Sequence, residues 1–526
     1  MNLKFTLFFS LFCGFVSAAT NTAPQVSIQA AVVDETAQLV TITYHLIDAE
    51  SDPCDIWLKT SKDGGIFFET IPAIELSNDF GSGVIPGNSK TLVWDYSAHS
   101  ANIYATKIKL VASDNQAISI ADMVSQVDSN KLKSNLGFIA GIRHYSAGLA
   151  HLNAVRDSIE NRFKSANLKT DRQDFSYSTF PLGQNILGRK AGLKDEAITY
   201  VVDAHYDGVS NGPAADDNGS GVAGMLEALR ILANYNFEHT LSFIGFDYEE
   251  SGLVGSTRYV QNGIRSYEDI QGVLNFEMIG YYTDSVNSQT MPAGFNVLFP
   301  QAYQSLQMDS FRGNTLIACG NTNSSSLLSQ FTTAATLYVP ALKVTSLEVP
   351  ANGGIAPDLR RSDHASFWDN GQKALMLTDG ANTRNKNYHT ASDSIGTLNF
   401  TFMTNVVKAT LATAAKLAVP LSSGFDERDL YPTAIVEHDH DFPAQVEIFP
   451  NPSNGSVFLK TKADNTFKSK VKVYDLKGGV VWSKVIDLAK GINTIELKMS
   501  DLPAASYILI LSAGESTISR SIVIKK

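Results

Sequence analysis

The sequence predicts an α/β protein with a mixed, mostly parallel sheet flanked by helices, between two small β-sandwiches. The middle of the chain, residues 119–419, alternates apolar runs of strand length with segments of helical period. Residues 20–118 and 444–526 instead alternate apolar and polar residues between frequent turn signals. Strands alternating with helices favour a parallel sheet, and short strands between turns favour a sandwich. A chain of 526 residues is also too long for one core.

Residues 1–19 are predicted to form a secretory signal peptide. Lys4 supplies the positive start, Phe5–Val16 the apolar core, and Ser17–Ala19 the small residues of a cleavage site. The apolar run is too short to span a bilayer, and no later run is long enough. We therefore expect an exported protein without a membrane span.

Composition narrows the classes of partner. The formal net charge is −11 with a pI near 5.4, and no basic patch interleaved with aromatic residues occurs, so we expect no nucleic-acid binding. Cys54 and Cys319, the two cysteines beyond the signal peptide, are far apart in the sequence, so the fold should not depend on disulfides.

The first predicted sandwich, residues 20–118, resembles immunoglobulin-like or fibronectin-type modules. Val26–Ala30 and Val40–Tyr44 alternate apolar and polar residues, and Asp63-Gly64-Gly65 is a turn signal. The acids of this region stand singly in turns, where solvation is their usual state. We expect no chemistry there.

Residues 119–419 are the predicted α/β domain, which begins with two helices and ends in an amphipathic helix. Residues 420–443 are polar and proline-punctuated, and we interpret them as a linker. The linker's Glu437–Asp441 run could bind a metal adventitiously, but no frame of strands or loops preorganises it. Residues 444–526 form the second predicted sandwich, with a hairpin connection at Asp475–Gly479.

Ionisable residues follow the predicted strands of the middle domain. The strand that begins at Ile198 ends in His205 and Asp207, a Gly-rich loop then carries Asp217, and the next strand is followed by Glu249 and Glu250. In open α/β sheets, ligands bind at the carboxyl ends of the strands. Histidine and carboxylates that converge there suit a divalent cation such as Zn²⁺.

Two later residues complete the predicted site: Glu277, at the end of another apolar strand, and His364, in a polar loop. The set then offers two imidazoles and three carboxylates. If one carboxylate bridges two metals, each metal keeps an open position for a shared water, as a catalytic site requires. We expect Asp207 to orient His205 and Glu249 to remain free as a general base. The predicted metal ligands are His205, Asp217, Glu250, Glu277 and His364.

Each residue also has a simpler structural interpretation. Asp217 could cap a helix, the pair Glu249–Glu250 could be a solvated loop, and His364 could be an ordinary loop or core histidine. Glu277 is harder to explain in this way, because burying an unpaired carboxylate is costly. We interpret His389 as structural or as a residue that supports a ligand.

Five blocks of this region resemble the signature blocks of the exported di-zinc aminopeptidases, metallopeptidase family 28, in the family's order. The resemblance implies that Asp217 bridges two zinc ions and that Glu249 is the general base. It also implies that one zinc is held by His205 and Glu277 and the other by Glu250 and His364. Glu277 departs from the family's usual Asp. The blocks are His205–Asp207, Gly212–Gly221, Glu249–Ser256, Asn275–Gly280 and Ser362–His364.

The C-terminal region that begins at Val446 resembles the sorting domain of the bacterial type IX secretion pathway. The resemblance rests on the stretch Val446–Gly455, Val-Glu-Ile-Phe-Pro-Asn-Pro-Ser-Asn-Gly. It implies passage through the periplasm, the secretion machinery as a partner, and release or attachment at the cell surface.

Together these observations predict a secreted, zinc-dependent aminopeptidase that removes the N-terminal residue from peptides with a free N-terminus. The alternatives are a glutaminyl-cyclase-like transferase with one zinc, a carboxypeptidase or dipeptidase of the same fold, and a non-catalytic surface adhesin. The pocket walls are expected from the insert between Tyr281 and Arg361. The sequence leaves open the preferred side chain, the oligomeric state, and whether aromatic residues of the insert line a pocket or pack its core. These are Tyr303, Phe311, Phe331 and Tyr338.

Overall fold

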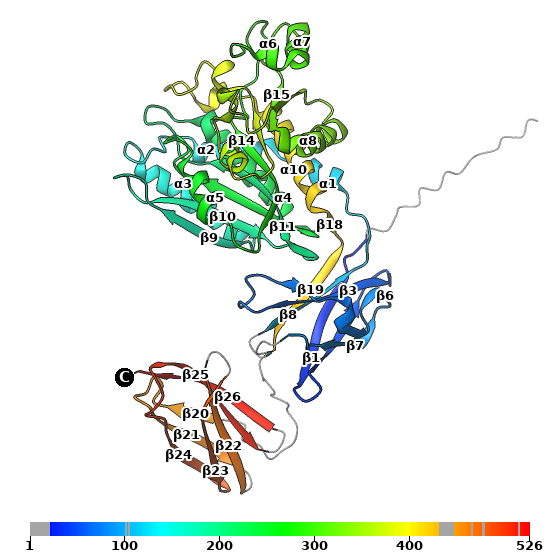
Figure 1. The fold of residues 1–526 in the computed structure, drawn as a ribbon, viewed down its shortest axis with the longest axis vertical. Helices are drawn as coiled ribbons and strands as arrows, with labels where there is room; N and C mark the ends of the chain where they lie inside the picture. The colour runs from blue at the N-terminus through cyan, green and yellow to red at the C-terminus, as the bar shows by residue number, and fades with distance from the viewer. Residues whose placement is uncertain are drawn as a thin grey trace, which may run out of the picture.

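A computed structural model describes residues 21–99, 103, 106–430, 446–463, 466–475, 479–513 and 516–525. The predicted signal peptide lies outside the described residues, as does the Glu437–Asp441 run. Figure 1 shows three bodies along the long axis of the molecule: the α/β domain, the first β-sandwich and the C-terminal β-sandwich. None of the helices in the described part of the chain is long and apolar enough to cross a membrane.

The α/β domain is built on an eight-stranded mixed sheet in the order β16-β15-β17-β14-β11-β13-β10-β9. Strand β11 pairs in parallel with both β13 and β14, and β14 pairs in parallel with β17, so the centre of the sheet is parallel as predicted. Antiparallel pairs join β15 to β17 and β10 to β13 and β9. The strands are β9 (Lys169–Phe175), β10 (Gly183–Lys190), β11 (Asp195–His205), β13 (His239–Phe246), β14 (Asp269–Glu277), β15 (Leu316–Asn321), β16 (Val344–Val349) and β17 (Ala374–Thr378).

Helices cover both faces of this sheet. Neighbouring strand residues point to opposite faces, so Val202 joins the larger core beneath one helical layer and Val201 joins the core beneath the other. The larger layer contains α1 (Ile120–Ser125), α2 (Ser129–Ile139), α3 (Leu149–Ser165), α4 (Gly221–Leu232), α8 (Ser325–Tyr338) and α10 (Phe400–Ala418). The other layer contains α5 (Val254–Asn262), α6 (Phe295–Leu298), α7 (Pro300–Met308) and α9 (His364–Asp369).

The first β-sandwich takes one strand from beyond the α/β domain. Strand β19 pairs antiparallel with β8 along its whole length, and Leu430 is buried in the sandwich core. Residues 420–430 therefore differ from the predicted linker. They form β18 (Pro420–Leu421), which pairs with β12 (Asn236–Phe237), and β19 (Ser423–Asp429), whose backbone hydrogen bonds are satisfied by the edge of β8. The remaining strands are β1 (Gln25–Asp34), β2 (Leu39–Ile47), β3 (Cys54–Ser61), β4 (Glu69–Thr70), β5 (Leu76–Asn78), β6 (Gly81–Val84), β7 (Gly87–Asp95) and β8 (Lys107–Ser113).

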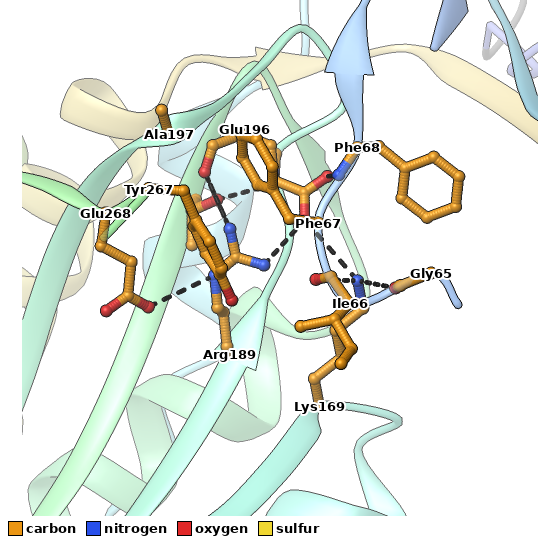
Figure 2. A network of polar contacts seen from close by, with 12 residues as sticks. Gly65, Ile66, Phe67, Phe68, Lys169, Arg189, Glu196, Ala197, Tyr267 and Glu268 are labelled. Atoms are coloured by element: carbon orange, nitrogen blue, oxygen red, sulfur yellow. Dashed lines mark hydrogen bonds and ion pairs between the residues drawn. The ribbon is translucent and has the colours of Figure 1, made fainter. Parts of the chain in front are cut away.

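A buried ionic network joins the first sandwich to the α/β domain (Figure 2). Glu196 accepts a 2.7 Å hydrogen bond from Arg189 and a 3.2 Å hydrogen bond from the backbone amide of Phe68 in the sandwich. Lys59 of β3, fully buried, lies 3.8 Å from the same carboxylate. The ring of Phe67 stacks on that of Tyr267 at 4.4 Å. The Glu196 carboxylate thus contacts groups from both domains.

The C-terminal sandwich has its own apolar core between two antiparallel sheets. Alternate residues of β21, such as Val457 and Leu459, are buried, as the alternating pattern predicts. Its strands are β20 (Val446–Phe449), β21 (Ser456–Ala463), β22 (Phe467–Tyr474), β23 (Val480–Leu488), β24 (Gly491–Lys498), β25 (Ala505–Ala513) and β26 (Ser516–Ile524).

Candidate metal centre

His205 and Glu277 are the last residues of β11 and β14, which are parallel neighbours in the sheet. Their side chains therefore meet at the carboxyl edge, where Nε2 of His205 lies 3.4 Å from Oε2 of Glu277. Both residues are buried. Ser362 donates a 2.8 Å hydrogen bond to the same Glu277 oxygen, which orients that carboxylate.

Asp217 lies between two histidines. It belongs to the buried loop between β11 and α4, and its Oδ1 lies 3.6 Å from Nε2 of His205, while its Oδ2 lies 3.0 Å from Nε2 of His389. Asp393 accepts hydrogen bonds from the backbone amides of Asp216 and Asp217 and so holds the loop. A carboxylate placed in this way can donate one oxygen to each of two cations.

The acidic pair Glu249–Glu250 follows β13. Oε2 of Glu249 lies 3.9 Å from Nε2 of His205, and Oε2 of Glu250 lies 3.2 Å from Nε2 of His389. Two groups of possible ligands result, each with its donor atoms within 4.8 Å of one another: His205, Glu249 and Glu277 in one, and Asp217, Glu250 and His389 in the other.

His364 is not part of either group, contrary to the prediction. It begins α9, its Nε2 donates a 2.9 Å hydrogen bond to the carbonyl of Leu359, and its ring packs edge-on against Trp368. The start of the helix turns His364 into the core, whereas Ser362 of the same motif faces Glu277. His389, which the sequence analysis interpreted as structural or supporting, occupies the position expected of His364.

A signal for His389 was present in the sequence. The loop that carries His389 leaves the carboxyl end of β17, the strand next to β14. This loop therefore starts at the same edge of the sheet as the other candidate ligands. The path of the loop after that edge is not a local property of its sequence. Hydrogen bonds to distant residues fix it, such as that from Asn385 to Oδ2 of Asp216 at 2.9 Å.

Asp207 ties two strand ends together. Its carboxylate accepts hydrogen bonds from the backbone amides of Glu249, at 3.0 Å, and of Glu250, at 3.2 Å. It also lies 3.4 Å from Nδ1 of His205. Asp207 is thus placed to orient the His205 ring and the acidic pair at once.

The centre concentrates buried negative charge. Burial raises the pKa of the Glu249 carboxyl well above its usual range, and burial together with the charge of Asp217 raises the pKa of Glu250 to about 7. Burial opposes protonation of His389, but the carboxylates of Asp217 and Glu250 outweigh it and raise the pKa of His389 to about 10. So many acids in one buried place need a compensating cation.

Several buried atoms of the centre have no hydrogen-bond partner among the described residues: Nε2 of His205, Nε2 of His389 and Oε1 of Glu250. Unpaired buried polar atoms are rare unless a ligand takes them. Imidazole nitrogen and carboxylate oxygen together are donors that Zn²⁺ accepts. The donor set therefore fits zinc.

A cavity of about 290 Å³ opens beside the centre, with Glu277 and Tyr388 on its wall. Its remaining wall is mixed. Apolar side chains of Met291, Phe295, Ile317, Leu347, Leu359 and Met376 lie there together with the charged residues Asp358 and Arg361 and several threonines. Several of these residues belong to the predicted insert, but the four aromatic residues singled out from the sequence do not line it. Phe331, for example, is buried in the core of the larger helical layer.

Comparison with known proteins gives two family matches. The model of peptidase family M28 matches residues 185–414, and that of the secretion system C-terminal sorting domain matches residues 447–525. An uncharacterised protein, YfbL, of Escherichia coli (strain K12) is 30% identical over 271 residues, 49% of this chain and 78% of that protein.

Two further relatives have descriptive names. A "probable zinc metalloprotease" of Pyrenophora tritici-repentis (strain Pt-1C-BFP) is 25% identical over 333 residues, 56% of this chain and 68% of that protein. Aminopeptidase YwaD of Bacillus subtilis (strain 168) is 40% identical over 100 residues, 18% of this chain and 22% of that protein. The family M28 match, residues 185–414, extends across the elements that carry the candidate metal centre.

Proposed function

Because this chain belongs to peptidase family M28 and is a zinc-dependent peptidase, we propose that it is a two-zinc aminopeptidase acting on peptides with a free N-terminus. The observation that carries the proposal is the position of Asp217, whose two carboxylate oxygens face different imidazoles. This arrangement suits a pair of cations that share one ligand.

The residues divide into two ligand sets. His205 and Glu277 would hold one zinc, Glu250 and His389 the other, and Asp217 would contribute one oxygen to each. When bound, zinc lowers the pKa of a water molecule and polarises the carbonyl of the scissile bond. His389 thus replaces His364 in the ligand set that the sequence predicts.

Glu249 is the residue proposed to move the proton. Its Oε2 reaches the centre from the side of His205, and its backbone amide is fixed by Asp207. Burial raises the pKa of its carboxyl, which brings it closer to the range in which a carboxylate can both accept and release a proton near neutral pH. Oε2 would take a proton from the attacking water and pass it to the departing amine.

The cavity beside Glu277 would receive the side chain of the residue that is removed. Its volume of about 290 Å³ and the Met, Phe, Ile and Leu side chains on its wall suit a large, mainly apolar side chain. We therefore propose that peptides beginning with residues such as Leu, Met or Phe are the preferred substrates.

The C-terminal sorting domain sets where the enzyme acts. A domain of this kind directs the chain through type IX secretion to the cell surface or the medium. We propose that the substrates are peptides outside the cell, and that the sorting domain engages the secretion machinery and takes no part in hydrolysis.

Leucine 4-nitroanilide, with and without an N-acetyl group, tests the proposal. We expect hydrolysis of the free amine substrate alone, loss of activity with EDTA, recovery with Zn²⁺, and two zinc ions per chain by metal analysis. Hydrolysis of the acetylated substrate at an equal rate would contradict an aminopeptidase. One zinc per chain, with cyclisation of an N-terminal glutamine, would favour the transferase.

A further inference from the structure

Arg143 lies between α2 and α3 and is completely buried, yet within the described residues it forms no ion pair. All of its hydrogen bonds go to backbone carbonyl oxygens. Nε donates to Tyr206 (2.8 Å), Nη1 to Ile139 (2.9 Å), Gly141 (3.2 Å) and Pro213 (3.2 Å), and Nη2 to Ala214 (2.9 Å). Each of the three guanidinium nitrogens therefore donates to at least one backbone carbonyl.

Three of these carbonyls belong to one loop, residues 206–214. The loop leaves β11 directly after His205 and ends three residues before Asp217. The backbone around Arg143 is also bonded to it: Gly208 donates to the Arg143 carbonyl at 2.8 Å, and Gly141 donates to the Pro213 carbonyl at 2.7 Å. Arg143 therefore contacts both ends of the segment that separates two proposed metal ligands.

The end of this loop has an unfavourable backbone conformation. Ala214 has a φ of 49°, in the left-handed region, where a residue with a Cβ is strained by about 1 kcal/mol or more. Its carbonyl is the acceptor for Nη2 of Arg143. The hydrogen bond from Arg143 therefore stabilises the residue of this loop that has the strained backbone conformation.

Arg143 keeps its charge at neutral pH. Burial lowers its pKa to about 10, and the carboxylates of Asp207 and Asp217 counter that effect. The positive charge lies below the acids of the centre without pairing directly with any of them.

We propose that Arg143 is a positioning residue that holds the loop between His205 and Asp217 in its metal-binding shape before a metal is bound. The proposal rests on the two-zinc centre proposed above. It adds that an arginine outside the motifs of the ligands keeps the loop in the required conformation.

The first test compares Arg143→Lys with Arg189→Lys. Lysine keeps the charge but cannot reach carbonyls on several sides at once. Arg189 is also buried but lies at the domain interface, so its replacement controls for the loss of any buried guanidinium. We expect both variants to have a lower Tm than the wild type. Only Arg143→Lys should bind zinc about 10- to 100-fold more weakly, measured in competition with a chromogenic chelator. Equal zinc affinity in Arg143→Lys and the wild type would overturn the proposal.

A second test needs no variant and stays informative if Arg143→Lys does not fold. In metal-free wild-type protein, hydrogen–deuterium exchange should show the backbone amides of Tyr206 and Gly208 protected, because they donate to the carbonyls of Phe246 and Arg143, in contrast to the exposed segment 284–287. Exchange as fast as in 284–287 would mean that the loop is not preformed and would overturn the proposal. Neither readout uses peptide hydrolysis, so failure of the aminopeptidase proposal is recognised separately.

Discussion

The backbone amide of Glu249 donates a 3.0 Å hydrogen bond to the carboxylate of Asp207, which also accepts the amide of Glu250 and lies 3.4 Å from Nδ1 of His205. Asp207 follows β11, and the acidic pair follows the neighbouring strand β13. One carboxylate thus aligns groups that follow two neighbouring strands.

Replacing Asp207 with Asn should weaken zinc binding about 10- to 100-fold, the usual cost of losing a group that orients a ligand. The amide offers one acceptor oxygen in place of two, so it cannot serve both backbone amides and the His205 ring. Chelator competition measures the affinity. Asp171→Asn, at an exposed ion pair with Arg265, is the control and should bind zinc normally. Normal binding by Asp207→Asn as well would show that Asp207 does not orient the ligands.

Replacing Glu249 with Gln should leave both zinc ions bound but lower kcat by about 10²- to 10⁴-fold, because Gln cannot accept the proton. Metal analysis and turnover of leucine 4-nitroanilide measure the two effects. Glu250→Gln is the matched comparison. Because Glu250 is a proposed zinc ligand, we expect this variant to bind less zinc. Full turnover by Glu249→Gln would remove Glu249 from the role of base.

His389→Asn and His364→Asn should differ in metal content. His389 lies 3.0 Å from Asp217 and 3.2 Å from Glu250, so we expect its replacement to reduce the content from two zinc ions to one. His364 bonds to the Leu359 carbonyl, so its replacement should keep both ions and lower stability by about 1–3 kcal/mol. Loss of zinc from His364→Asn alone would reverse the assignment.

Met291→Trp should narrow the cavity beside Glu277. Met291 is half-buried on its wall, and we expect kcat/KM to fall about 10- to 100-fold for leucine 4-nitroanilide but much less for the alanine substrate. Val297→Trp, at an apolar residue that is 79% exposed and does not line the cavity, is the control. An equal loss with both substrates would mean that the cavity does not receive the first side chain.

Glu196→Gln should destabilise the docking of the first sandwich. Glu196 faces Lys59 and Arg189 in a buried setting, so removing its charge leaves cations uncompensated and should cost about 3–5 kcal/mol of unfolding free energy. Denaturant unfolding measures this cost. Glu238→Gln, at an exposed pair with Lys194, should change stability by less than about 1 kcal/mol. Equal stability of the two variants would contradict the role given to the network.

Some features of the fold and the site could be predicted because they depend on local pattern. Runs such as Ile198–Ala204 identify buried strands, and the alternating segments identify sandwiches, so the α/β class with β-sheet regions on either side is confirmed. Residues at the carboxyl ends of parallel neighbouring strands reach one edge, which is why His205, Glu249 and Glu277 lie together. The sequence alone determines these positions because the period of a strand and its direction fix where it ends.

Tertiary structure alone decided which second histidine reaches Asp217, that Arg143 lies beneath the loop, and that β19 completes the first sandwich. His364 begins α9, whereas His389 lies in the loop after β17. The position of His389 after that strand indicates the correct edge of the sheet, but it does not fix the path that brings the ring to Asp217. Contacts of the folded chain decide which histidine reaches Asp217. Asn385, in the loop of His389, bonds to Asp216, whereas His364, the first residue of α9, bonds to the carbonyl of Leu359. A loop has no repeating pattern of apolar residues, so its path depends on the contacts that it makes in the folded chain.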